Sequence, residues 1–126
     1  MAQYDNLPVY KAVYDLLQSI YRDTGNVPRD VKFTLIETLK NELTEILVLI
    51  YKANSTSEKL PLIIEMRERI VGVKVRLRLL HDLRHISTKL YAHQVEQVES
   101  VSKQLASWQK YVKEHPPKQG ADGSGK

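Results

Sequence analysis

The segment LPLIIEMRERIVGVKVRLRLLHDLRH, residues 60–85, predicts a long amphipathic helix and, through it, the fold. At about 100° per residue, apolar side chains at three- and four-residue steps share one helical face. One such stripe consists of Ile63, Met66, Ile70, Val73, Leu77 and Leu80. Pro61 falls in the first turn, where its missing N–H group costs little. The stripe therefore indicates a helix that buries one face against other helices.

The same segment carries a second apolar stripe on a different side of the helix. Its members are Leu60, Ile64, Val71, Val75, Leu79 and Ile86. A helix in an isolated bundle needs one buried stripe, and a large apolar patch in water usually marks an interface. We therefore expect a homo-oligomer interface made by Ile64, Val71, Val75 and Leu79. It would build a closed ring, or a two-fold dimer if the surface is self-complementary. The alternative is one wide stripe with residues at its margins.

Three further segments have the period of amphipathic helices, and they run over residues 8–24, 28–53 and 87–114. Candidate N-caps precede the first, third and fourth helices, namely Asp5 or Asn6, Ser57 and Ser87. Because the connections are short, sequential helices should pack antiparallel. The sequence predicts an all-α, up-down four-helix bundle over residues 1–114. A flexible basic tail follows over residues 115–126, where consecutive prolines and a Gly/Ser/Lys stretch cannot continue a helix.

The composition excludes several classes of protein. There are no cysteines among the 126 residues, so a disulfide scaffold, a thiolate metal site and a cysteine nucleophile are ruled out. The lack of cysteine fits a reducing cytoplasm. The N-terminal residues lack a secretory signal, and the longest apolar run, Ile46–Tyr51, is far shorter than the ~20 residues that span a bilayer. We expect a soluble cytoplasmic protein with no membrane contact.

Basic charge is concentrated in one short segment. The net charge is +4 with a pI near 9.3, and residues 69–85 alone hold five basic residues and one acid. The candidate residues for binding a nucleic acid or a protein partner are Lys74, Arg78, Arg76, Arg84, Arg67, Arg69, Arg29 and Lys32. Guanidinium groups suit phosphate oxygens, and clustered cations release counterions from a polyanion. The alternative is a solvated face with acidic partners. No base-reading motif is present, so contacts would be to the backbone.

Catalytic and cofactor motifs are absent from the sequence. No Glu-x-x-His pair, phosphate-binding glycine loop, dinucleotide fingerprint or nucleophile elbow occurs, so we expect no enzyme activity and no cofactor. His81 and His85 have a spacing that could share a metal, but no third ligand is evident, and we expect no metal site. The tyrosines Tyr10, Tyr14 and Tyr21 lie along one edge of the first helix, either as a partner-binding strip or as bridges between core and solvent.

The chain resembles the accessory variability determinant (Avd) proteins of diversity-generating retroelements. These proteins are related to four-helix proteins encoded in bacterial 23S rRNA intervening sequences. The resemblance covers nearly the whole chain and lies in length, helix order and scattered positions. It is carried by Tyr14 with DLL at 15–17, Val27-Pro28-Arg29, residues 43–53 ending in IYKA, VRLRLLHDL at 75–83 and LASW at 105–108.

The resemblance implies a pentameric barrel of basic four-helix bundles. Such proteins are partners of a retroelement reverse transcriptase and its template RNA, and they support mutagenic copying while the polymerase does the chemistry. The family's basic positions on its third helix would fall on Lys74 and Arg78, with Arg76 and Arg84 as further candidates. One departure is a net charge below that expected of an Avd protein. The alternative that this leaves open is an intervening-sequence relative of unknown role.

Overall fold

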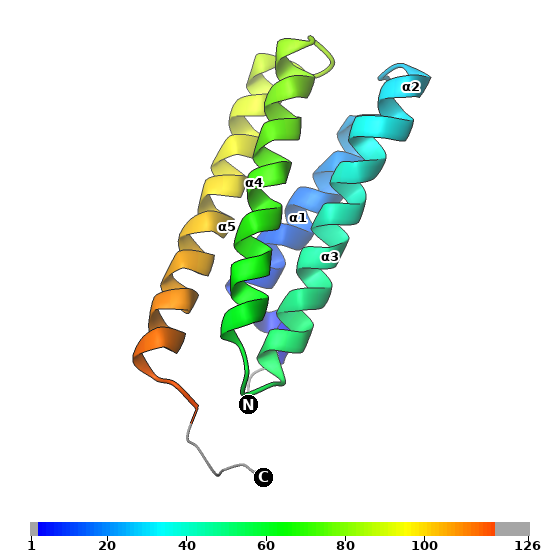
Figure 1. Cartoon of the computed structure of the whole chain (residues 1–126). Coiled ribbons are helices and arrows are strands. Elements are labelled where there is room, and N and C mark those ends of the chain that lie inside the picture. The colour runs from blue at the N-terminus through cyan, green and yellow to red at the C-terminus, as the bar shows by residue number, and fades with distance from the viewer. Residues whose placement is uncertain (1–2, 118–126) are drawn as a thin grey trace.

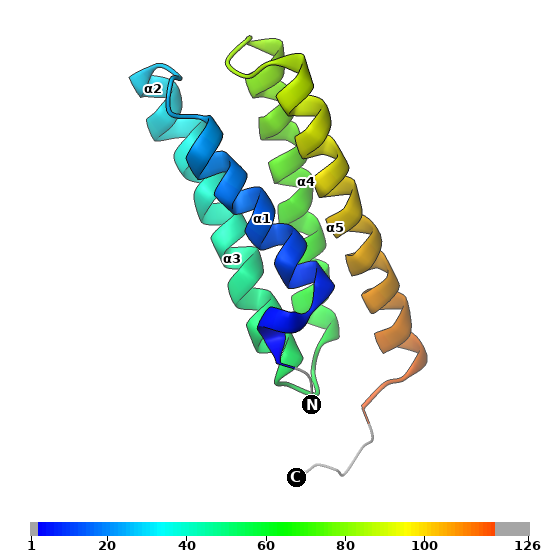
Figure 2. The ribbon, with the colours of Figure 1, turned by 180° about the vertical axis from the view of Figure 1, so that it is seen from behind.

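The computed structural model describes residues 3–117, and this part of the chain is helical without strands. The four long helices are α1 (Pro8–Asp23), α3 (Glu37–Asn54), α4 (Leu60–Asp82) and α5 (Thr88–Glu114). They run alternately up and down, and each packs against two neighbours in the order α1, α3, α4, α5 and back to α1 (Figures 1 and 2). The predicted all-α, up-down four-helix bundle is confirmed.

The core consists of one aliphatic stripe from each long helix. All six residues of the first α4 stripe are buried, between 0% and 3% exposed. They meet Val13, Leu16 and Ile20 of α1, together with further aliphatic side chains of α3 and α5. Three polar side chains of residues 3–117 are also buried, Ser19, Thr24 and Gln94, and Gln94 of α5 is 0% exposed. No helix of the described residues is long and apolar enough to cross a membrane.

The second predicted helix is divided in the structure. It consists of α2 (Arg29–Val31), a π-helical turn η2 (Lys32–Ile36) and then α3. The hydroxyl of Thr34 donates to the carbonyl of Asp30 at 2.8 Å, and the hydroxyl of Thr38 bonds the carbonyl of Thr34 at 2.6 Å. Threonine bonds to the carbonyl one turn back compete with the regular ladder and bend helices. The two threonine bonds accompany the π-helical turn η2, which is wider than a turn of α-helix.

Two of the three predicted caps are wrong. Asp5 and Asn6 lie in a 3₁₀ turn, η1 (Tyr4–Asn6), and α1 begins after Leu7 with no side-chain cap. Ser57 does not cap α4, because the helix begins after Lys59. The Lys59 ammonium instead donates to the carbonyls of Ala53 and Thr56, at 2.6 and 2.7 Å. The bond to Ala53 joins Lys59 to the C-terminal end of α3.

The turn between α4 and α5 comes earlier than predicted. Helix α4 ends at Asp82 rather than near His85, and Arg84 adopts a left-handed conformation with φ of 64°. Ser87 is the N-cap of α5, as predicted, and accepts a hydrogen bond from the Leu90 amide at 3.0 Å. Of the tail predicted over residues 115–126, residues 118–126 lie outside the described part of the chain.

Candidate interaction surface on helix α4

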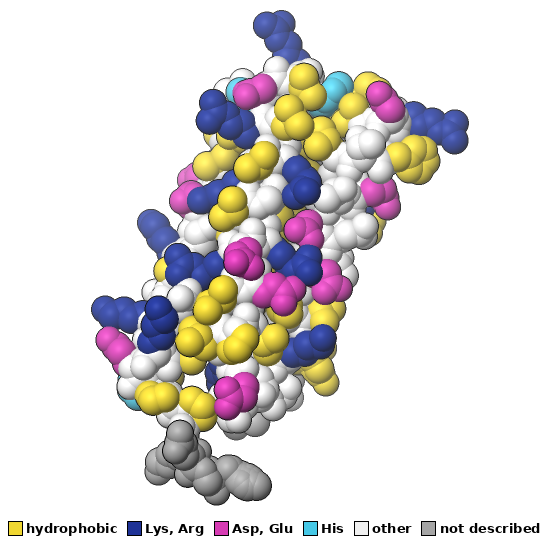
Figure 3. Space-filling view, viewed as in Figure 1, with side chains coloured by type: hydrophobic (Ala, Val, Ile, Leu, Met, Phe, Trp, Pro, Cys, Tyr) yellow, Lys and Arg dark blue, Asp and Glu magenta, His cyan; other side chains and the backbone are white. Residues whose placement is uncertain are grey.

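Helix α4 presents an apolar ridge to solvent. Its four members are Ile64, Val71, Val75 and Leu79, with exposed fractions of 40%, 56%, 61% and 42%. At 1.5 Å rise per residue the ridge is about 22 Å long. Figure 3 shows hydrophobic side chains following α4 on the face turned to the viewer, between charged side chains. We call these four residues the α4 ridge.

The predicted second stripe is correct at these four positions and wrong at its ends. Ile86 is 7% exposed and belongs to the core, whereas Leu60 is partly buried and packs against it. The prediction was wrong for Ile86 because α4 ends at Asp82, so beyond that residue the side chains no longer turn by 100° per residue. Because the four central residues are exposed on the opposite side from the core, they are not the margin of one wide stripe.

The side of the ridge that faces α5 carries Arg67, Lys74 and Arg78. The ammonium of Lys74 pairs with the carboxylate of Glu99 on α5 at 2.9 Å. Arg67 donates to the amide oxygen of Gln109 at 2.6 Å, and Arg78 pairs with an aspartate one turn on at 3.4 Å. These groups are exposed, and exposed ion pairs contribute only about 0.2–1 kcal/mol. A phosphate could therefore replace these partners at small cost.

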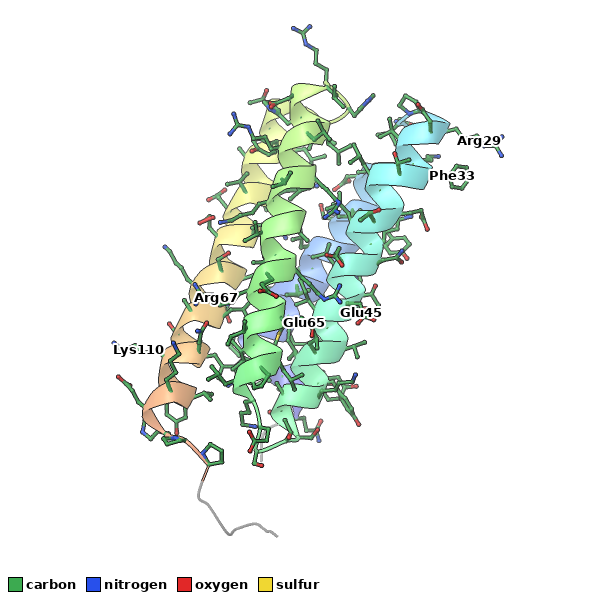
Figure 4. The ribbon with its side chains drawn as sticks, viewed as in Figure 1. Arg29, Phe33, Glu45, Glu65, Arg67 and Lys110 are labelled. Carbon is green, nitrogen blue, oxygen red and sulfur yellow. The ribbon has the colours of Figure 1, made fainter. Side chains whose placement is uncertain are left out.

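The side of the ridge that faces α3 carries Arg69 and Arg76, which differ in their surroundings. Arg69 bonds Glu65 at 2.9 Å and also Glu42 of α3. The hydrogen bond to Glu65 raises the pKa of the Arg69 guanidinium, and Figure 4 shows Glu65 at the seam with α3. Arg69 therefore links two helices. Arg76 forms no ion pair among residues 3–117, and it is partly buried with its guanidinium beside Gly72.

The remaining predicted cations lie at one end of the bundle, outside the two rows that flank the α4 ridge. Arg84 is in the α4–α5 turn, while Arg29 and Lys32 are on α2 and η2. Both segments lie at the same end of the bundle in Figure 1, but on different helix pairs. The Arg29 guanidinium lies over the ring of Phe33, 5.5 Å from its centre, and Figure 4 shows both far from Arg67. The eight candidate cations therefore do not form one patch.

A groove between α4 and α5 adjoins the ridge. The sequence did not predict this groove. It has a volume of about 310 Å³, and its lining includes Val75, Leu77, Tyr91 and Val95. Lys74 and Arg78 lie in its wall with Glu99. The groove depends on the register of α5 against α4, and the apolar period of either helix alone does not give that register. The groove is therefore an apolar hollow beside the ridge, with Lys74 and Arg78 in its wall.

The two histidines considered for metal binding lie where α4 meets α5, with His81 in the last turn of α4 and His85 in the turn that follows. The Nδ1 atom of His81 lies 3.2 Å from Asp82, and its Nε2 atom lies 3.2 Å from the hydroxyl of Thr88. Its ring stacks on Tyr91 with 4.5 Å between centres. The described residues contain no group of three or more His, Cys, Asp or Glu side chains that could hold a metal ion. The ring contacts join the ends of α4 and α5.

Comparison with known proteins places most of the chain in one family. Residues 8–112, which include all four long helices almost completely, match the model of the bAvd-like family. No curated protein matches the sequence.

Proposed function

Since the chain belongs to the bAvd-like family, an accessory and non-catalytic kind of protein, we propose that it assists a retroelement reverse transcriptase. In this proposal it binds the polymerase and the template RNA in the cytoplasm and supports mutagenic copying, while the polymerase carries out the chemistry. The observation that carries the proposal is the α4 surface, where an exposed apolar ridge runs between two rows of cations.

The ridge is proposed as a contact between copies of the chain. Burying a whole Val, Leu or Ile side chain contributes about 1.5–3 kcal/mol, so covering four that are already half-buried contributes about 3–6 kcal/mol. Association itself costs about 4–15 kcal/mol. The ridge is therefore a contribution to self-association and needs further contact area on the neighbouring copy. A ring of five copies is the arrangement that the resemblance implies.

The cations beside the ridge are proposed to contact the RNA backbone. Lys74, Arg76 and Arg78 flank the ridge on its two sides, and only the first and last have ion-pair partners among the described residues. Several copies assembled in a ring would present these groups repeatedly to one polyanion. Such contacts recognise phosphates rather than bases, so we expect strong dependence on salt and little dependence on sequence.

The binding proposal is tested by reversing charge at Lys74 and Arg78. The double variant Lys74→Glu and Arg78→Glu should weaken binding of a single-stranded RNA, measured by fluorescence anisotropy, and pull-down of the polymerase. Its slope of log affinity against log salt should be smaller by about 0.7 per lost phosphate contact. The control makes the same change at Lys103 and Lys110, exposed lysines of α5. Equal binding by the two double variants at low salt would contradict the proposal.

The assembly proposal is tested by Val75→Asp, which puts a charge into the middle of the ridge. We expect a smaller particle in sedimentation velocity and an unchanged helical spectrum, because an unpaired carboxylate cannot be buried cheaply. Tyr111→Asp is the control, since Tyr111 of α5 is exposed to nearly the same extent, 59% against 61%. An unchanged particle for Val75→Asp would refute the role of the ridge.

The genomic neighbourhood separates the proposed function from its alternative. A reverse transcriptase gene beside a template repeat supports the retroelement accessory role. A location inside a ribosomal RNA gene would instead favour an intervening-sequence relative.

A further inference from the structure

A second exposed surface lies on the helix pair opposite α4 and α5. It contains five of the seven tyrosines of the chain, which we call the tyrosine strip, namely Tyr51, Tyr4, Tyr10, Tyr14 and Tyr21. The first four form a chain of ring contacts with 4.8, 5.2 and 6.2 Å between successive centres. Farther along α1, the ammonium of Lys40 lies 4.2 Å from the ring centre of Tyr21. Because Tyr51 and Lys40 belong to α3, the strip follows the seam between α1 and α3.

The strip is hollowed between its rings. One hollow, of about 390 Å³, is lined by Tyr14, Leu17, Gln18, Tyr21 and Arg22. A second, of about 460 Å³, adjoins it and shares Tyr14 and Gln18. Tyr14 and Tyr21 are 46% and 62% exposed, which leaves large ring surfaces in water. Tyrosine combines apolar area with few rotatable bonds and a polar end, and it is enriched among the strongest contacts of protein interfaces.

The two helix pairs carry charges of opposite sign. Helices α4 and α5 together contain nine Lys or Arg residues and six acids, a surplus of three positive charges. Turn η1 with α1 and α3 contains four Lys or Arg residues and six acids, a surplus of two negative charges. Two copies that meet through their α4 faces would bring like surpluses together, whereas an α4 face against an α1–α3 seam brings opposite surpluses together. Complementary potentials of this kind guide association and suppress the wrong pairing.

Shape favours the same pairing. The α4 ridge is a single row of exposed aliphatic side chains, and the α1 side of the tyrosine strip carries two shallow hollows lined by residues of η1 and α1. The ridge alone contributes too little to offset the cost of association, so it requires a partner face with apolar area of its own. We propose that the tyrosine strip of one copy receives the α4 ridge of the next copy. This inference rests on the self-association proposed above and specifies the surface that completes it.

The consequence is a head-to-tail interface. Each copy uses two different surfaces, one to donate the ridge and one to receive it, so addition can continue until the rotation closes a ring. A two-fold dimer through α4 alone is excluded by this arrangement. The two surfaces also fail independently, since a copy with a damaged ridge keeps a working strip.

This independence gives the experiment. The ridge variant carries Val75→Asp and Leu79→Asp, and the strip variant carries Tyr14→Asp and Tyr21→Asp. All four positions are exposed, between 42% and 62%, so both variants should keep the helical spectrum of the parent. Each variant alone should sediment as a single chain of 14.5 kDa. An equimolar mixture should form a particle of twice that mass, because one intact strip meets one intact ridge and the other two surfaces are damaged.

The controls separate this inference from the proposed self-association. Tyr14→Phe with Tyr21→Phe keeps the rings and should keep the parent assembly. A strip variant that retains the parent assembly, or a mixture that stays at the mass of one chain, overturns the strip while leaving the ridge in place. A parent protein that is a single chain at every concentration overturns self-association itself, and the strip inference with it.

Discussion

Replacing Gln94 with methionine should stabilise the protein. Gln94 of α5 is 0% exposed, and neither its Nε2 nor its Oε1 atom has a hydrogen-bond partner among the described residues. A buried polar group without a partner costs about 1–3 kcal/mol relative to solvation in the unfolded chain. Methionine is unbranched, of similar length and equally compatible with a helix. We therefore expect Gln94→Met to raise the free energy of unfolding by about 1–3 kcal/mol.

The assay is urea unfolding followed by circular dichroism at one protein concentration, with thermal melting as a second measurement. For a domain of this size each kcal/mol corresponds to roughly 5 °C, so Tm should rise by about 5–15 °C. The control is Gln104→Met, because Gln104 is partly exposed and its amide donates to Ser100 at 3.1 Å. It should change stability by less than about 0.5 kcal/mol. A loss of stability in Gln94→Met would refute the reasoning, because it would show that the amide is hydrogen-bonded in the folded protein.

Three further predictions concern the α4 helix and the tyrosine strip. Arg84→Gly should raise the free energy of unfolding by up to about 1 kcal/mol, since glycine adopts the left-handed φ of 64° freely. Arg78→Gly, inside helix α4, should lower the free energy of unfolding by about 1 kcal/mol. Chemical unfolding of both glycine variants measures the difference. Gly72→Ala should add about 0.5–1 kcal/mol in the same assay. Only the flexible end of Arg76, 2.7 Å from the new Cβ, must move, so a loss would show that this guanidinium is fixed. Burial, and then neighbouring tyrosines, raises the pKa of Tyr10, so the folded chain keeps this proton longer than the unfolded chain. Stability should fall as the pH rises above about 10, the pKa of tyrosine in the unfolded chain, and Tyr10→Phe should reduce this fall when urea unfolding is repeated at increasing pH.

The spacing of apolar residues predicted the fold because it shows which helical face is hydrophobic, and that face is the one that becomes buried. The stripe from Ile63 to Leu80 repeats at helical steps, and all its members are in the core. The same period located the α4 ridge, and it was wrong at Ile86 because a left-handed residue ends the regular geometry before that position. The π-helical turn at 32–36 was not predictable in this way, since five residues are too few to distinguish its period from that of an α-helix.

Charge was less predictable than burial, because the partners of a cation come from other helices. The pair between Arg78 and Asp82 spans one turn and can be read from the sequence. The pair between Lys74 and Glu99 joins α4 to α5, and the bonds of Arg69 include one to α3. These depend on how neighbouring helices are aligned along their axes. The tyrosine strip has the same origin, since an edge of three tyrosines on α1 is extended by residues of η1 and α3.

The pairing pattern determines which cations can serve a polyanion. Arg69 is held between Glu42 and Glu65 with its side chain 29% exposed, so a phosphate would have to break two carboxylate contacts that also join α3 to α4. Lys74 is 43% exposed with a single partner, and Arg78 is 75% exposed with a partner on its own helix. Replacing such partners costs little, because exposed pairs are weak. If the ridge is covered by a neighbouring copy, these two cations lie along the α5 side of that contact, where Lys74 already faces Glu99. The surface that we propose to join the copies and the surface that we propose to bind the nucleic acid are then two sides of one helix, so a substitution can remove either one without the other.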